Sequence, residues 1–173
     1  EKVLRKAPCP VLTVPPPAGG LQLEGSVLFR RILCPVDFSA PSVAALGYAL
    51  RLAEQSASEI TFVHVLEWLV EEEPGARIAG LDVPEFRRYL EKDARERLRQ
   101  LVPAEAKDWC RTREEVVGGR PWREILRLAE EREVELVVMG VRGRNPVDIA
   151  LFGSTTHHVI RGARCPVLVV HSG

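Results

Sequence analysis

The segment Val134-Glu135-Leu136-Val137-Val138-Met139-Gly140-Val141-Arg142-Gly143 joins an apolar run to a turn bounded by glycines. A run that is almost continuously apolar predicts a strand buried on both faces, as in a parallel sheet covered by helices. Nine residues after Gly143, the segment Gly153-Ser154-Thr155-Thr156 opens a predicted helix. These two segments therefore predict a strand, a loop and a helix that meet at one edge of an α/β sheet.

Strand and helix patterns alternate on both sides of this loop. Strands are predicted at 31–36, 60–66, 109–117, 134–139 and 165–170, and helices after the N-cap Ser39 to residue 55, at 82–102, at 121–132 and from 154. Alternation of this kind predicts an α/β fold with an open five-stranded parallel sheet and helices on both faces. The first helix is expected to bury one stripe: Val43, Ala44, Leu46, Ala49, Leu50 and Ala53. Ligands bind such sheets at the carboxyl ends of the strands, so the strand ends to inspect are Asp37, Val65 and Gly140.

The end of the chain repeats a segment from its beginning. Residues 3–14 align without a gap with residues 159–170, and Cys9-Pro10-Val11-Leu12 matches Cys165-Pro166-Val167-Leu168. Two copies this far apart in the sequence indicate tandem domains rather than a solenoid. We interpret residues 1–15 as the C-terminal remnant of a preceding domain, 16–30 as a linker and 31–173 as a complete domain. The chain is thus expected to be a fragment of a tandem two-domain protein.

Composition excludes several classes of partner. Hydrophobic residues make up 46% of the chain, charged residues 28%, and the formal net charge is zero. This balance is globular and leaves no electrostatic footprint for nucleic acid or a membrane surface. The cysteines Cys9, Cys34, Cys110 and Cys165 have no metal-binding spacing, so no metal site is predicted; Cys34 and Cys165 are expected to be buried. Reduced thiols predict a cytoplasmic protein.

The loop after residue 139 has the chemistry of a phosphate site. Glycines let the backbone approach an anion closely, and a helix N-terminus adds unpaired N–H groups and a positive dipole end. Ser154, Thr155 and Thr156 add hydroxyl groups, and Arg142 and Arg144 add positive charge. The alternative is a glycine turn followed by an ordinary Ser N-cap. The spacing is neither a Walker A loop nor a dinucleotide-binding fingerprint.

At this point the sequence resembles the universal stress protein family. Gly140-x-x-Gly143, nine residues and Gly153-Ser154 look like the ATP-binding signature of that family. Residues 32–39 are similar to its first strand, and residues 165–170 to its last strand. The likeness covers about residues 31–171 together with 3–14. It implies a Rossmann-like fold of the adenine-nucleotide alpha-hydrolase kind.

The resemblance also implies a ligand, ATP, with Mg or Mn where a metal takes part. Pro35 and Asp37 would lie at the adenosine end, Val65 would hold the adenine through its backbone, and Met139 and Gly140 would flank base and ribose. The phosphates would be held by Arg142, Gly143, Gly153, Ser154, Thr155 and Thr156. Two departures from the family pattern are the apolar Val141 and the acidic Asp148 inside the loop. The family's fifth strands also imply that 9–14 pairs antiparallel with 165–170, within one chain or in a homodimer.

Three functions remain open at this level. The leading one is ATP binding as a regulatory state in a stress response, with slow hydrolysis at most, because no side chain is placed as a general base. The second is an interaction module of the same fold that binds no nucleotide. The third is an adenylating enzyme, although the stretch after the first strand has no glycine-rich, pyrophosphate-binding motif.

Several other residues are expected to be structural. One or both of His157 and His158 are expected at the surface rather than in catalysis. His64 is expected at the edge of the core, and Phe86 in packing rather than in a lid with Trp68. The arginines Arg95, Arg97 and Arg99 are expected to form a charged helix face with Glu91, Asp93 and Glu96 rather than a nucleic-acid patch.

Overall fold

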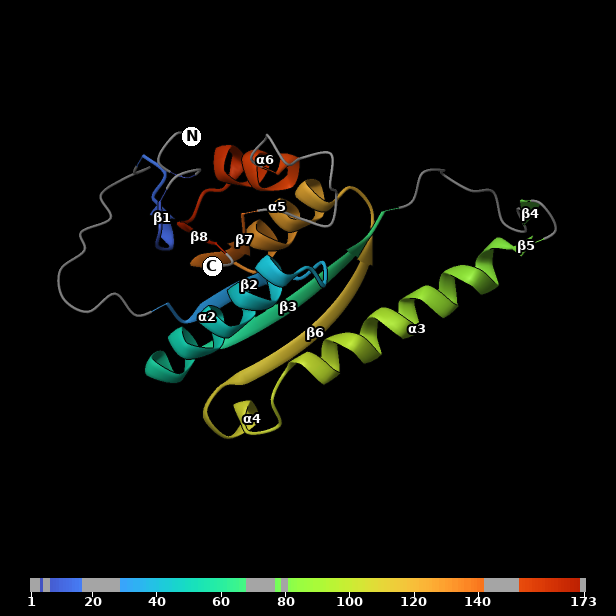
Figure 1. Ribbon diagram of the computed structural model, residues 1–173, viewed down its shortest axis with the longest axis horizontal. Coiled ribbons are helices and arrows are strands. Elements are labelled where there is room, and N and C mark those ends of the chain that lie inside the picture. The colour runs from blue at the N-terminus through green and yellow to red at the C-terminus, as the bar shows by residue number, and fades with distance from the viewer. Residues whose placement is uncertain are drawn as a thin grey trace.

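The computed structural model describes residues 4, 7–16, 29–67, 77–78, 81–141 and 153–171. Within them, a six-stranded sheet has the strand order β1-β8-β7-β2-β3-β6 (Figure 1). Five strands are parallel and form the predicted α/β sheet: β2 (Arg31–Pro35), β3 (Glu59–Leu66), β6 (Arg111–Gly118), β7 (Leu136–Gly140) and β8 (Val167–Val170). The sixth strand, β1 (Val11–Thr13), is antiparallel to β8 and lies at the sheet edge.

Helices cover both faces of the sheet, as the alternating pattern predicts. On one face, α2 (Ala40–Ser56) and α3 (Val83–Leu101) pack with the short helix α4 (Ala106–Trp109) over a core that includes Phe62. On the other face, α5 (Pro121–Glu131) and α6 (Ser154–Gly162) pack over a core that includes Val63. Neighbouring residues of one strand thus point into different cores, which explains the continuous apolar runs. A small separate hairpin joins β4 (Arg77–Ile78) and β5 (Leu81–Asp82).

Helix α2 begins where the sequence places its N-cap, but its buried stripe differs. The Ser39 hydroxyl accepts from the N–H of Ser42 at 3.4 Å, and Pro41 occupies the first turn. The Ser42 hydroxyl donates to the Ser39 carbonyl at 2.9 Å, so Ser42 faces inward and Val43 is turned outward, 38% exposed. The expectation that Val43 is buried is therefore wrong, whereas Ala44 is half-buried and packs against the core. The buried residues of α2 are Ser42, Ala45, Leu46, Ala49, Leu50 and Ala53.

Three predicted strands start two residues later than expected, among them the strand predicted from residue 134, which starts at Leu136. The other two shift for local reasons. The strand predicted to start at residue 109 starts at Arg111, because Trp109 ends helix α4 and the Cys110 N–H donates to the Ala106 carbonyl at 3.0 Å. Strand β8 starts at Val167 rather than at residue 165, after a proline that has no N–H to give to a ladder.

The predicted pairing of the repeated segments is confirmed, and it occurs within the chain. Val11 faces Val169, Leu12 faces Leu168 and Thr13 faces Val167 in the antiparallel register. Because Leu12 and Leu168 are also equivalent positions of the repeat, this register has a local twofold axis at that pair. The carbonyl of Leu4 adds a 2.7 Å contact to Nε2 of His171.

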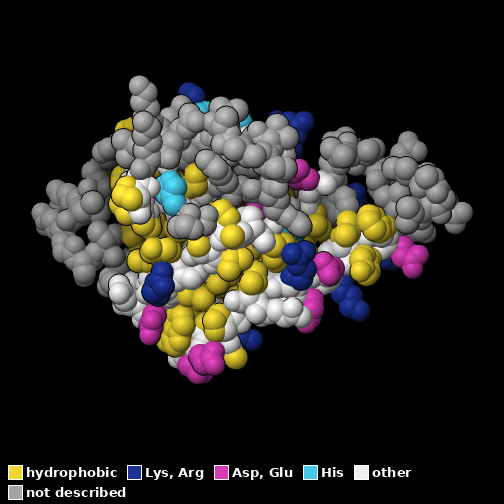
Figure 2. Space-filling model, in the orientation of Figure 1, with side chains coloured by type: hydrophobic (Ala, Val, Ile, Leu, Met, Phe, Trp, Pro, Cys, Tyr) yellow, Lys and Arg dark blue, Asp and Glu magenta, His cyan; other side chains and the backbone are white. Residues whose placement is uncertain are grey.

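Helix α3 extends away from the sheet at its N-terminal end (Figure 1). Figure 2 shows hydrophobic side chains exposed over this part of the helix, where Phe86 is 47% and Tyr89 64% exposed. The expectation that Phe86 packs into the fold is therefore wrong: its helix projects beyond the strands that would cover it. Trp68, its proposed lid partner, lies outside the described residues.

Candidate functional site

The strand order places a switch point at the carboxyl edge of the sheet. From β2 the chain proceeds to β3 and β6 on one side, whereas β7 and β8 lie on the other side. Crevices outside the strand ends at such reversals are where open α/β sheets bind ligands. A cavity of about 410 Å³ lies here, across the ends of β7, β2 and β3.

Nine of the residues predicted for the site line this cavity together. They are Pro35, Asp37, Val65, Met139, Gly140, Gly153, Ser154, Thr155 and Thr156. Arg142 and Gly143 lie outside the described residues, as do Arg144 and Asp148. The structure therefore brings the described part of the predicted site to one place, while the binding role of each residue stays a prediction.

The β7 side of the cavity is formed by the N-terminus of α6. Ser154 is exposed and Thr155 half-buried, so their hydroxyl groups and the first N–H groups of the helix can meet a ligand. Thr156 is different, because its buried hydroxyl donates to the carbonyl of Gly140 at 3.0 Å. That bond ties the helix to the end of β7 and uses the hydroxyl proton that a phosphate would need.

Gly140 has a packing role in addition to the predicted backbone approach to an anion. A Cβ built on Gly140 would lie 2.7 Å from the carbonyl carbon of Pro41 and 2.9 Å from its oxygen. Strand β7 and the first turn of α2 are therefore in contact at this position, and a side chain cannot fit between them without movement.

The β2 side of the cavity presents the carboxylate of Asp37. Its Oδ1 accepts from the Ser39 N–H at 3.0 Å and from the Ser39 hydroxyl at 2.5 Å, while its own N–H donates to the Ser42 hydroxyl at 3.3 Å. These bonds fix the carboxylate on the turn between β2 and α2. Since the described bonds engage Oδ1, Oδ2 is the oxygen that a ligand would meet.

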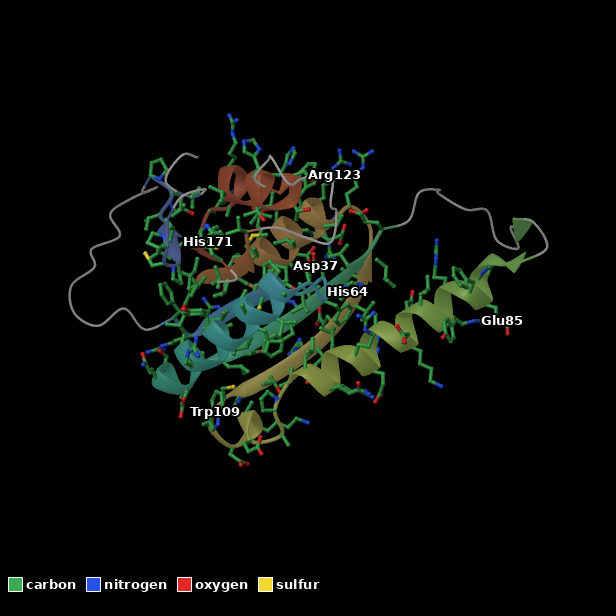
Figure 3. The ribbon with its side chains drawn as sticks, viewed as in Figure 1. Asp37, His64, Glu85, Trp109, Arg123 and His171 are labelled. Carbon is green, nitrogen blue, oxygen red and sulfur yellow. The ribbon has the colours of Figure 1, made fainter. Side chains whose placement is uncertain are left out.

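His64 lies beside Asp37, at the end of the neighbouring strand β3 (Figure 3). It is 9% exposed, and Nδ1 lies 2.7 Å from the Val36 carbonyl, so Nδ1 carries the hydrogen of this bond. The Phe38 ring packs against the imidazole with 4.6 Å between centroids, and the Arg97 guanidinium carbon lies 3.9 Å from the centre of that ring. The expected core-edge position of His64 is correct, but sequence analysis missed its place in the cavity wall.

Other lining residues were also missed: Val36, Ser42, Val63, Leu66, Glu67, Pro121 and Ile125. One signal was present for Pro121, which opens a helix directly after a strand and so belongs to the same sheet edge. Glu67 follows Leu66 at the end of β3 and carried a similar signal. The inward side chain of Ser42 had none, because it depends on how α2 lies against the sheet.

His158 is not part of this cavity. His158 is exposed, stacks on Trp122 with 4.9 Å between ring centroids and does not line the cavity. The described part of the chain contains no group of three or more His, Cys, Asp or Glu residues that could hold a metal ion. Nor does any described helix have the length and apolarity required to cross a membrane.

The thiols differ in their surroundings. Cys34 is fully buried beneath the site, as expected, and burial raises the pKa of its thiol well above the ordinary value. Cys165 is half-buried rather than buried, and the pKa of its thiol is also raised by burial. Cys9, its counterpart in the repeat, is exposed.

Known proteins share this fold over most of the chain. The universal stress protein MJ0577 of Methanocaldococcus jannaschii is 31% identical over 159 residues, which cover 84% of this chain and 96% of that protein. A solved structure of MJ0577 gives a TM-score of 0.71 at 29% identity, covering 85% of this chain and 99% of the other.

Two more distant solved structures carry evidence for the fold alone. One is a universal stress protein in complex with cAMP, 20% identical with a TM-score of 0.57, covering 85% of this chain and 100% of the other. The other is a functionally unknown protein from Pseudomonas aeruginosa PAO1, 19% identical with a TM-score of 0.65. That match covers 98% of this chain but 54% of the other, so the Pseudomonas chain is nearly twice as long.

The family model described as the universal stress protein family matches residues 28–171, which include all the parallel strands and the cavity. Because this match spans most of the chain and agrees with the similarity to MJ0577, this chain belongs to the universal stress protein family.

Proposed function

We propose that this protein binds ATP in the cavity at the carboxyl edge of the sheet and that the bound nucleotide is a regulatory state in a stress response. The observation that carries the proposal is the convergence in one cavity of the α6 N-terminus, Gly140 and the fixed carboxylate of Asp37. A volume of about 410 Å³ is within the range of small-molecule sites.

The two sides of the cavity suit the two parts of the nucleotide. At the α6 side, N–H groups and the hydroxyls of Ser154 and Thr155 would hold the phosphates, joined by the Gly140–Gly143 loop. At the β2–β3 side, Asp37 would accept from the adenine amino group or a ribose hydroxyl, and Val65 would bind the base through its backbone. A Mg or Mn ion would arrive on the phosphates.

Slow hydrolysis at most is expected. The lining side chains suited to act as bases, Asp37, His64 and Glu67, belong to the β2–β3 side, whereas the phosphates would lie at the N-terminus of α6. Bound ATP would regulate the protein by changing its stability or the partners that it binds. We place this activity in the cytoplasm.

Thermal unfolding with ATP and magnesium tests the proposal. A ligand that binds the folded state at a hundred times its Kd stabilises it by about 2.7 kcal/mol. For a chain of this size, the melting temperature should rise by roughly 5–10 °C. Gly153→Asp should abolish the rise by adding bulk and like charge at the phosphate side. No rise in wild type at millimolar ATP would favour the alternative function, an interaction module of this fold without a nucleotide.

Base selectivity can be tested separately at Asp37. Asp37→Ala should weaken binding of ATP more than binding of inorganic tripolyphosphate. Asp108→Ala, at an exposed position on α4, is the matched control and should leave both affinities unchanged. An equal loss for both ligands would mean that Asp37 supports the fold or the phosphates rather than adenosine.

We also propose a domain organisation and a partner surface. Residues 1–15 would be the end of a preceding universal-stress-type domain, 16–30 the linker and 31–173 the complete domain. The local twofold register of β1 and β8 supports this assignment, and so does a match to nearly all of this chain within a protein almost twice its length. In this view β1–β8 pairing is the contact between tandem domains, and removal of β1 would free β8 to form a homodimer.

A further inference from the structure

Phe38 adopts a backbone conformation that is uncommon for its residue type. Its φ is +64°, in the left-handed region where a side chain is strained. The other non-glycine residues with positive φ among those described are Ala57 and Glu133, which lie just after the ends of α2 and α5. Phe38 instead directly follows Asp37 in the cavity wall, and strain of this kind persists where surrounding contacts over-determine it.

The side chain of Phe38 supplies such contacts. Its ring lies 4.6 Å from the His64 imidazole, centroid to centroid, and the guanidinium carbon of Arg97 lies 3.9 Å from the ring centre. His64 belongs to β3 and is itself bonded to the Val36 carbonyl at 2.7 Å. Arg97 belongs to α3 and has Asp93 within 3.8 Å. The ring thus links the turn after β2 to a cavity-lining residue and to the helix above it.

We propose that Phe38, held by Arg97, is a positioning residue for the adenosine side of the nucleotide site, an inference that rests on the proposed function. Held in this conformation, Phe38 keeps Asp37 and Ser39 in the turn that fixes the Asp37 carboxylate through Oδ1. Loss of the ring removes the contacts that oppose the backbone strain. The turn then relaxes, and Oδ2 of Asp37 moves from the place where adenosine would meet it.

The test compares ATP with inorganic tripolyphosphate by titration calorimetry on the full chain. Phe38→Leu should raise the Kd for ATP about tenfold, because a hydrogen bond to a charged carboxylate is weakened. The Kd for tripolyphosphate should change by less than about twofold, because the phosphate side is untouched. Phe38→Tyr, which keeps the ring, should bind ATP within about threefold of wild type.

Arg97→Met removes the guanidinium group that stacks on the Phe38 ring and changes no residue of the turn. It should raise the Kd for ATP by about threefold, and the double variant should be no weaker than Phe38→Leu alone, since both act through one ring. The matched control is Arg51→Met. Arg51 lies 4.4 Å from the Tyr48 ring on α2, a similar cation–aromatic pair that does not line the cavity, and its loss should leave ATP binding unchanged.

Phe38→Gly separates positioning from folding. Glycine accepts the left-handed conformation without strain, so the loss of ring packing is partly offset and the melting temperature should stay within about 5 °C of wild type. Because the turn then has no strain to release, Asp37 keeps its place and ATP should bind within about threefold of wild type, unlike in Phe38→Leu. ATP binding unchanged in Phe38→Leu would overturn the inference while leaving the proposed function intact, and so would equal loss of both ligands. A wild-type protein that binds no ATP would overturn both.

Discussion

The contact between Gly140 and Pro41 predicts that Gly140→Ala destabilises the fold. In Gly140→Ala the new Cβ would start 2.7 Å from the Pro41 carbonyl carbon and 2.9 Å from its oxygen. Carbon atoms in contact are normally about 3.5–4.0 Å apart, so β7 and α2 must separate by on the order of 1 Å. Both neighbours are backbone atoms, which cannot rotate away as a flexible side chain would.

Overpacking of this kind costs about 1–3 kcal/mol of the free energy of unfolding. In a domain of this size, that lowers the melting temperature by roughly 3–10 °C. Thermal and urea unfolding, followed by circular dichroism, measure both quantities. Since Pro41 follows the turn that carries Asp37, ATP binding should weaken in the same variant.

Gly47→Ala is the control, because Gly47 lies inside α2 and a Cβ there would meet nothing within 4 Å. Alanine at an open helical position should raise stability by about 0.5–1 kcal/mol. If Gly140→Ala melts at or above the wild-type temperature while Gly47→Ala behaves as expected, then β7 and α2 are not in the contact described here.

Four further predictions concern single side chains and the terminal strand. Thr156→Val should lower the free energy of unfolding in urea by about 1–3 kcal/mol, because the buried Gly140 carbonyl loses the hydroxyl that donates to it at 3.0 Å. A loss smaller than about 0.5 kcal/mol would mean that a water molecule replaces this hydroxyl as donor. Iodoacetamide should label Cys9 and leave Cys34 unmodified in the folded protein, because Cys9 is exposed and burial raises the pKa of Cys34 and keeps it a thiol. The raised pKa of Cys34 contributes stability that is fully present below pH 9.0, the ordinary pKa of a thiol, and that is lost as the pH rises above it. The Cys34→Ala variant lacks this group, so above pH 9.0 its free energy of unfolding, measured in urea, should fall less steeply than that of wild type, by up to about 1.4 kcal/mol per pH unit. Deletion of residues 1–16 should uncover β8 and promote dimerisation in sedimentation velocity, whereas a variant that stays monomeric would contradict the capping role of β1.

Much of the fold could be predicted from the sequence because its signals are local. The apolar run at 134–139 indicates burial on both faces, and Ser39 with Pro41 marks a helix start. Helix α4 was missed because four residues carry too little periodicity to stand out beside the predicted strand. The outward turn of Val43 depends on hydrogen bonds of Ser42, which no pattern of apolar residues records.

The candidate site was predictable where glycines and hydroxyl residues mark it, and hidden where tertiary contacts form it. Gly140 and Gly153 indicate a loop that approaches an anion, yet the packing of Gly140 on Pro41 needs the position of α2. The left-handed Phe38 has no sequence signal, because phenylalanine is not a residue type that favours this conformation. Arg97 lies on the predicted charged face of α3 and also stacks on Phe38, a contact that has no sequence signal.

Equilibrium dialysis of the purified chain against labelled ATP with magnesium measures directly whether the cavity binds ATP. The cavity predicts saturable binding of one ATP per chain, displaced by unlabelled ATP and lost in Gly153→Asp, while that variant keeps its circular dichroism spectrum. Absence of saturable binding by a folded wild-type protein at millimolar ATP would contradict the account of this cavity as a nucleotide site.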